Sequence, residues 1–160
     1  MRGERVELWL LAPEAAVSLS GDGDGGLTWI GTDGPFEGSR RAATMMVKAV
    51  EAGRYDPAWG IFAIVRTADQ LALGGIGFHG PPADGLVEIG FDLVPAARGH
   101  GYAAEAARVL SRWALAQDEV KTVVGRTEPD NLGSQRVMES AGFTRISGPE
   151  DEMLSYHLDG

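Results

Sequence analysis

The sequence predicts a single α/β domain of mixed (α+β) type, with a mostly antiparallel sheet that contains one parallel pair of strands. A chain of 160 residues is long enough for one domain with a full hydrophobic core. Apolar runs in the middle of the chain follow one another at hairpin-length spacing, which is typical of antiparallel strands. A strand–helix–strand unit from Leu86 to Arg126 requires a parallel pair with a right-handed crossover. We therefore expect about six to seven strands flanked by about four helices.

The first third of the chain is expected to contain one strand and two helices. Val6–Leu11 is predicted as a strand, and a proline then suits the first turn of a short helix over Pro13–Leu19. Gly21–Gly34 is a loop dense in Gly and Asp, and long loops in compact domains are usually functional. Phe36–Ala52 has the apolar spacing of a helix, and a glycine follows it.

Three strands are predicted in the middle of the chain. Ile61–Arg66 is nearly all apolar, as expected for a strand that is buried on both faces. Leu71–Phe78 is the next strand, and the pair Gly74-Gly75 inside it indicates a β-bulge. Apolar and polar residues alternate in Leu86–Val94, so its polar side chains share one face of the sheet.

The last third alternates helices with strands. Alanines and leucines at helical spacing predict a helix that begins near Tyr102 and ends near Gln117. Thr122–Arg126 is predicted as a strand and Asn131–Ala141 as a helix that ends at a glycine. Phe143–Ile146 and Met153–Leu158 are predicted as a final antiparallel pair.

The composition is that of an ordinary globular domain, with 44% hydrophobic and 23% charged residues. The net charge of −9 argues against a nucleic-acid partner, because such proteins present a basic face. No apolar run approaches the length of a membrane span, so no membrane partner is expected. The absence of cysteine excludes disulfides and thiolate metal sites and fits a cytoplasmic location. The acidic balance slightly favours a cationic amine as ligand.

The segment Arg98–Ala103 (RGHGYA) has the composition of an anion-binding loop. It leads from a predicted strand into the most regular helix of the chain. Glycines allow the backbone to turn with positive φ, and the first N–H groups of a helix are unpaired and carry partial positive charge. A diphosphate would fit such a loop. The alternative is an ordinary strand-to-helix turn.

A second polar pair begins the helix after the parallel strand. Asn131 and Ser134 extend the core-facing stripe of this helix at its N-terminal end, where their polar groups need partners. Both side chains could face a cleft that holds a polar ligand. In the alternative, Asn131 is only the N-cap, and the Ser134 hydroxyl bonds back to the carbonyl of Asp130.

The order of these motifs resembles the GCN5-related N-acetyltransferase (GNAT) family, most closely the branch of ribosomal-protein N-terminal acetyltransferases (RimJ/RimL-like). The resemblance rests on Arg98-x-x-Gly101-x-Ala103 after a strand and before a helix, then Asn131-x-x-Ser134 and Ala141-Gly142-Phe143. It is strongest over residues 74–146. It implies one GNAT-like domain over residues 1–160, in which two central parallel strands splay apart around acetyl-CoA.

The resemblance also implies roles for individual residues. Backbone groups near Leu93 and Val94 would bind the pantetheine amides, Asn131 would bind the same arm, and Ser134 would approach the thioester sulfur. The residues implied to surround the diphosphate are Arg98, Gly99, His100, Gly101, Tyr102 and Ala103. No metal ion is implied, and the spacing of the three histidines predicts no metal site.

Acetyl transfer to an amine needs a proton acceptor, a polarised carbonyl and a partner for the leaving thiolate. Glu88 is the first choice as base, since relatives in this branch often carry a carboxylate on this strand, and Asp92 on the same face is the second. Glu88 could instead be a solvent-facing charge. Ser134 is expected to serve the thiolate, with Tyr156 as the substitute because this helix lacks a tyrosine. His79 and His157 could contribute.

The sequence thus predicts an acetyl-CoA-dependent N-acetyltransferase that acts on a primary amine by direct attack in a ternary complex. A non-catalytic acyl-CoA-binding sensor is the alternative. The acceptor could be a protein N-terminus or a small-molecule amine, and loop Gly21–Gly34, the helix after it and the loop near His79 are expected to select it. The resemblance also implies that homodimers can form.

Overall fold

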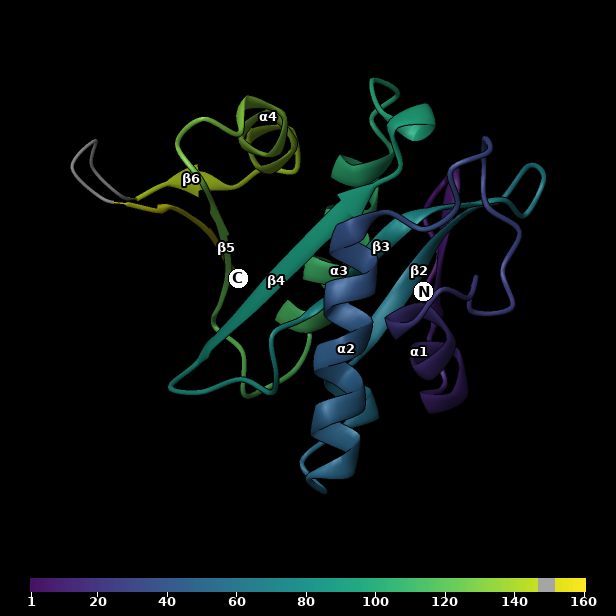
Figure 1. Ribbon diagram of the computed structural model, residues 1–160. Helices are drawn as coiled ribbons and strands as arrows, with labels where there is room; N and C mark the ends of the chain where they lie inside the picture. The colour runs from purple at the N-terminus through teal and green to yellow at the C-terminus, as the bar shows by residue number, and fades with distance from the viewer. Residues whose placement is uncertain (147–151) are drawn as a thin grey trace.

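A computed structural model of the chain describes residues 1–146 and 152–160. These residues form one seven-stranded mixed sheet in the order β1-β2-β3-β4-β5-β7-β6 (Figure 1). The strands are β1 (Val6–Leu10), β2 (Ile61–Arg66), β3 (Ala72–Phe78), β4 (Leu86–Leu93), β5 (Thr122–Thr127), β6 (Thr144–Arg145) and β7 (Leu154–Asp159). The helices are α1 (Pro13–Ser20), α2 (Glu37–Glu51), α3 (Tyr102–Leu115), α4 (Leu132–Ser140) and the 3₁₀ helices η1 (Pro57–Trp59) and η2 (Pro95–Ala97). The predicted fold class is confirmed.

Strands β1 to β4 form the antiparallel part of the sheet. Strand β2 has the predicted bounds, and its four central residues are buried because helices cover both of its faces. The β-bulge predicted in β3 is present, but it lies one residue before the Gly74-Gly75 pair. Ile64 pairs with Gly74 and the next residue of β2 pairs with Ala72, so Leu73 is the extra residue of a bulge.

The sheet has one parallel pair, β4 and β5, and this pair separates along its length. Pairing runs from Leu86 opposite Thr122 to Ile89 opposite Gly125 and then stops. Beyond that point β4 pairs only with β3, and β5 pairs with β7 on its other side. The two strands diverge toward their C-terminal ends, as Figure 1 shows. The splayed central pair implied by the resemblance is therefore present.

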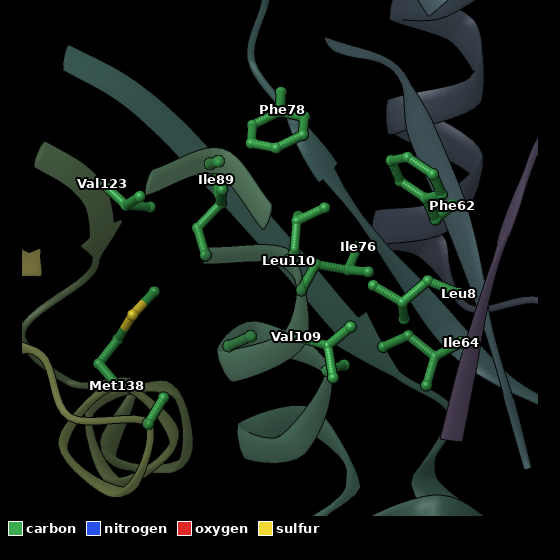
Figure 2. Close-up of a cluster of buried hydrophobic side chains, with 14 of the residues drawn as sticks. Leu8, Phe62, Ile64, Ile76, Phe78, Ile89, Val109, Leu110, Val123 and Met138 are labelled. Atoms are coloured by element: carbon green, nitrogen blue, oxygen red, sulfur yellow. The ribbon is translucent and has the colours of Figure 1, made fainter. Parts of the chain in front are cut away.

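Helices cover the two faces of the sheet in pairs. On one face α1 and α2 pack against alternate residues of β2, among them Ala63 and Val65. On the other face α3 and α4 close the larger core, in which Leu110 and Met138 contact buried strand residues such as Ile89 (Figure 2). This layering puts the polar face of β4 on the side of α2.

Most predicted elements lie where the sequence places them, with differences at their ends. Helix α3 ends at Leu115, two residues before the predicted end, and β6 is shorter than the predicted Phe143–Ile146 strand. Part of the predicted final hairpin, residues 147–151, lies outside the described residues. In the part of the chain that the structure describes, no helix is long and apolar enough to cross a membrane.

Candidate active site

The loop between β4 and α3 has the backbone that its glycines predict. After η2, Arg98 is extended, Gly99 has φ 82°, and Gly101 has φ 79° and occupies the N-cap position of α3. Both glycines are in the left-handed region, which costs a residue with a Cβ about 1–2 kcal/mol. A Cβ on Gly99 would meet no heavy atom within 4 Å, so one side of the loop is open.

A continuous row of backbone N–H groups on this loop finds no acceptor in residues 1–146 and 152–160. Among the described residues, none of the N–H groups from Gly99 to Ala104 donates a hydrogen bond, and the first bond of the helix comes from Glu105 N to Gly101 O at 3.1 Å. These groups lie at the N-terminus of a 14-residue helix, where the dipole adds partial positive charge. The loop can therefore bind an anion of several oxygens.

Arg98 lies between this loop and the end of β4. Its Nε donates to the Leu93 carbonyl at 3.1 Å, and its guanidinium carbon lies 4.8 Å from the centre of the Phe36 ring. These two contacts orient a cation that is otherwise exposed. The Arg98 charge is thus held beside the open N–H groups, where it adds to their attraction for an anion.

The same loop is supported from behind by the N-terminal segment. Arg5 donates to the His100 carbonyl at 2.8 Å and to the Glu105 carboxylate at 3.0 Å, and its guanidinium lies over the Tyr102 ring. Glu105 also accepts from the backbone N–H groups of Arg5 and Val6. Burial alone would raise the pKa of Glu105, but these hydrogen bonds and the Arg5 charge lower it. Sequence reasoning missed Arg5, which no local pattern connects to a loop far along the chain.

The backbone of β4 is open on the side from which β5 has separated. The Val94 N–H donates to the Leu73 carbonyl on β3 at 2.9 Å, so alternate residues of this stretch bond to β3. Phe91 and Leu93 alternate with the residues that bond to β3, so their backbone N–H and C=O groups point toward β5. One expectation is thereby corrected: the Val94 N–H is already bonded within the sheet, and Leu93 and Phe91 carry the groups that face the opening.

Asn131 and Ser134 begin α4. The Asn131 side chain accepts a hydrogen bond from Ser134 N at 3.1 Å, so Asn131 is the N-cap of this helix. The alternative bond from the Ser134 hydroxyl to the Asp130 carbonyl is not among the hydrogen bonds of the described residues. Ser134 is half-buried. Its hydroxyl therefore stays free to donate to a ligand, while Asn131 already has a structural role.

Tyr156 does not lie at the opening between β4 and β5. It is on β7 opposite Gly125, on the face that α4 covers, and its side chain has no exposed surface. Its hydroxyl is buried, and within residues 1–146 and 152–160 it has no hydrogen-bond partner. Burial and, to a smaller extent, the charge of Glu139 raise the pKa of Tyr156. The expectation that Tyr156 substitutes as the catalytic acid is corrected, because a fully covered hydroxyl cannot reach a ligand in the opening.

Glu88 belongs to a charged cluster where β4 and β5 begin to separate. Its carboxylate accepts a hydrogen bond from Arg126 at 2.6 Å and lies 3.3 Å from Nδ1 of His79. The Glu88 side chain is 25% exposed, so it is not a freely solvated surface charge. Arg126 comes from β5 and His79 from the residue after β3. We name Glu88, Arg126 and His79 the β4–β5 cluster.

Asp92, the second candidate base, connects α2 to the sheet. Its carboxylate accepts hydrogen bonds from the N–H and hydroxyl of Ser39 at 2.8 and 2.5 Å and from the Gly75 N–H at 3.1 Å. Ser39 lies in the first turn of α2, so Asp92 satisfies an N-terminal N–H group of that helix. Burial raises the pKa of Asp92, although these hydrogen bonds and the Arg98 charge oppose the rise.

A cavity of about 950 Å³ lies between α2 and the polar face of β3 and β4. Its walls are largely aromatic and apolar, and include Trp29, Phe62 and Met45. Asp92 and His79 are among its polar lining groups. Loop Gly21–Gly34 contributes Leu27 and Trp29 to its lining. A ligand in this cavity would meet β4 on the face that carries the β4–β5 cluster.

Comparisons with known proteins agree with this geometry. The family model described as an acetyltransferase (GNAT) domain matches residues 12–144. A Bacillus subtilis (strain 168) protein named as an uncharacterized N-acetyltransferase, YjdG, is 43% identical over 81 residues, which are 50% of this chain and 48% of that protein. The chain spans about half the length of the curated relatives it matches.

Solved structures share the whole fold at low sequence identity. The ribosomal-protein-S5-alanine acetyltransferase from Vibrio fischeri is 14% identical with a TM-score of 0.64, covering 99% of this chain and 95% of that one. The microcin C7 self-immunity acetyltransferase MccE, solved in complex with acetyl-CoA and AMP, is 16% identical with a TM-score of 0.66, covering 98% and 93%. The predicted likeness to ribosomal-protein acetyltransferases therefore holds for the fold. With the family model matching most of its length, the chain belongs to the GNAT acetyltransferase family.

Proposed function

We propose that residues 1–160 form one acetyl-CoA-dependent N-acetyltransferase unit. The observation that carries this proposal is the row of N–H groups from Gly99 to Ala104, which follow the end of β4 and have no acceptor within the described part of the chain. A diphosphate on that loop would direct the rest of a coenzyme A molecule along the open edge of β4. The crystallised relative MccE, which shares the fold, holds acetyl-CoA.

In this arrangement the cofactor is bound mainly by backbone. The diphosphate accepts from the N–H groups of the Gly99–Ala103 segment, with the Arg98 guanidinium alongside. The pantetheine amides pair with the backbone of Leu93, and Asn131 approaches the same arm while it caps α4. Backbone recognition of this kind needs glycine at the turn and an unpaired strand edge, and both are present.

Transfer takes place by direct attack in a ternary complex. The acceptor amine, once neutral, attacks the thioester carbonyl, and the thiolate of coenzyme A leaves. The free hydroxyl of Ser134 donates to the sulfur as charge develops there. The proton that the ammonium form must lose goes to the β4–β5 cluster, which lies where the opening between the strands begins. No covalent enzyme intermediate is needed.

The acceptor is a primary amine, either a protein N-terminus or a small molecule, bound in the cavity under α2. That cavity reaches β4 at Gly90 and Phe91, beside the point of strand separation. An amine there approaches the thioester from the face opposite α3. A cytoplasmic location and a homodimeric state belong to the same proposal and rest on the cysteine-free sequence and on the family resemblance.

Calorimetric titration of the purified protein tests the cofactor site. We expect micromolar binding of acetyl-CoA and of CoA, and no heat with ATP. Thiol release is then measured with acetyl-CoA and a panel of amines that includes short peptides with free N-termini. Binding with turnover on at least one amine supports the enzyme, and binding with no turnover would indicate an acyl-CoA sensor. Absence of binding would refute the proposed cofactor site.

A further inference from the structure

The proposed reaction gives a proton to the β4–β5 cluster, and His79 is the member of that cluster that lines the cavity. His79 follows β3, and its backbone N–H donates to the Glu88 carbonyl at 2.9 Å, so it continues the pairing of β3 with β4 by one residue. Its imidazole folds over β4. A Cβ built on Gly90 would lie 2.6 Å from Nε2 of His79, so the ring covers the strand where a side chain would otherwise stand.

Gly90 is the residue of β4 that directly follows the end of its pairing with β5. The imidazole therefore lies at the point where the two strands separate, on the face of the sheet that carries α2. His79 and Gly90 both line the cavity under α2. Nε2 lies over Gly90, so a molecule that reaches this position of β4 from the cavity meets that ring nitrogen.

The other ring nitrogen faces a carboxylate. Nδ1 of His79 lies 3.3 Å from Oε1 of Glu88, while Oε2 of Glu88 accepts from Arg126 at 2.6 Å. A carboxylate beside Nδ1 favours the tautomer of a neutral imidazole that carries its proton on Nδ1 and a lone pair at Nε2. Because Arg126 occupies one oxygen and His79 the other, the Glu88 carboxylate is engaged on both sides and absent from the cavity lining.

We propose that His79, and not Glu88, is the general base that deprotonates the acceptor amine, and that Glu88 positions it with the support of Arg126. This inference rests on the proposed function and names the group that serves it. An imidazole is the side chain best suited to change charge near neutral pH. Glu88 fixes the tautomer and the ring orientation, and Arg126 fixes Glu88.

The proton balance of the step is complete without another reactant. The bound ammonium loses one proton to Nε2 of His79, and the freed nitrogen lone pair forms the N–C bond with the thioester carbonyl. The C–S bond breaks, and its electron pair leaves on sulfur. The second proton of the attacking nitrogen goes to the thiolate, and His79 returns its proton to water when the products leave.

The other titratable groups that line the cavity are poorly suited to this step. Asp92 is engaged by three donors and holds α2 in place. Asp56 accepts from Ala58 N as the N-cap of η1. Burial and the neighbouring Asp56 raise the pKa of Tyr55, so its phenolate is disfavoured. The remaining charged lining groups, Arg41, Lys48 and Arg54, are cations.

The test compares substitutions that preserve shape. His79→Gln keeps a donor for Glu88 but has no basic nitrogen. Glu119→Gln, which changes an exposed carboxylate outside the cavity lining, is the control. With acetyl-CoA and a peptide amine as substrates, we expect His79→Gln to lower kcat by about 10²–10⁴-fold. Calorimetric affinity for acetyl-CoA should stay unchanged, and Glu119→Gln should behave as wild type.

Two further readouts separate a base from a merely structural residue. Free imidazole added to His79→Ala should restore part of the turnover that this variant loses, because truncation leaves room for imidazole at the edge of the cavity. Nitrogen-15 NMR of the wild type should show that the proton of the neutral His79 ring is on Nδ1. Glu88→Gln should lower kcat without changing the affinity for acetyl-CoA. If His79→Gln retains wild-type turnover, Glu88 is the base. The same conclusion follows if Glu88→Gln lowers kcat more than His79→Gln does and imidazole rescues no turnover in His79→Ala. A wild type that binds no acetyl-CoA would refute the proposed function instead, and the NMR tautomer would still decide whether the predicted His79–Glu88 arrangement exists.

Discussion

Glu105→Gln should destabilise the fold through the contact between the N-terminal segment and α3. The wild-type carboxylate is 10% exposed and accepts from Arg5 Nε at 3.0 Å, from Arg5 N at 2.7 Å and from Val6 N at 3.3 Å. A glutamine retains one acceptor oxygen for the two backbone groups but turns an NH₂ group toward the Arg5 guanidinium. The bond to a charged partner that is lost contributes about 1.5–3 kcal/mol.

We therefore expect the free energy of unfolding at pH 7 to fall by about 2–3 kcal/mol. With a urea m-value of about 2 kcal/mol/M, the midpoint of unfolding should move down by about 1–1.5 M. Equilibrium unfolding followed by far-UV circular dichroism measures this shift. Glu119→Gln, which removes an exposed carboxylate four residues after the end of α3, is the control and should leave the midpoint within error of wild type.

The pH dependence gives the sharper test. The pKa of Glu105 is lowered in the folded state, so the unfolded chain binds the proton more tightly. The stability that ionised Glu105 contributes is then complete above its ordinary value of 4.5 and is lost as the pH falls through the lower folded-state pKa. The difference between wild type and Glu105→Gln should shrink in that acidic window. A difference that stays constant from pH 7 into the acidic range would show that ionisation of Glu105 is irrelevant to it.

Three other predictions concern the site and its frame. Gly101→Val places a β-branched residue at φ 79°, within 3.3 Å of the Arg5 guanidinium, and should abolish acetyl-CoA binding in calorimetry while the far-UV spectrum stays native; wild-type affinity would remove this loop from the cofactor site. Ser134→Ala should lower kcat more than it lowers acetyl-CoA affinity, because its bond strengthens as charge develops on sulfur; an unchanged kcat would assign thiolate protonation to water. Gly125→Ala puts a methyl group against the Met138 side chain and should cost about 1–3 kcal/mol in urea unfolding, with strong non-additivity when combined with Met138→Ala. Simple additivity of the two would show that they do not touch.

The regular elements were predictable where one physical signal dominates. Ile61–Arg66 was predicted with correct bounds because a strand covered on both faces is apolar throughout. The parallel pair followed from a strand–helix–strand unit that allows only one handedness. The short β6 was less predictable, since only Thr144 and Arg145 pair with β7 and the pairing partner fixes the length of an edge strand.

Burial distinguishes the two hydroxyl groups that were predicted to serve the leaving thiolate. Ser134 and Tyr156 are both polar groups on elements next to β5, and the sequence contains no signal that separates them. In the structure the Tyr156 side chain is fully buried in the larger core, whereas Ser134 lies in the first turn of α4 and stays partly exposed. Met138 of α4 packs on Gly125 of β5, the residue that pairs with Tyr156, so this packing decides which face of β7 is buried. The sequence pattern does not connect the segments that make this contact.

The proposed cofactor site is built mostly from residues that are close together in the sequence, whereas the proposed acceptor site is built from residues that are far apart in it. The loop Arg98–Ala103 presents backbone N–H groups to the proposed cofactor. Its backbone conformation is determined by nearby residues, because glycine occupies the two left-handed positions and a helix follows directly. The cavity that we propose for the acceptor is lined by residues of α2, β3 and the turn that carries His79, which the fold alone brings together. The sequence pattern therefore identified Glu88 as a carboxylate on the strand that became β4. Its contacts with Arg126 and His79 join residues that lie 38 and 9 positions away along the chain. Because these contacts occupy both oxygens of Glu88, we assign the base role to the imidazole of His79.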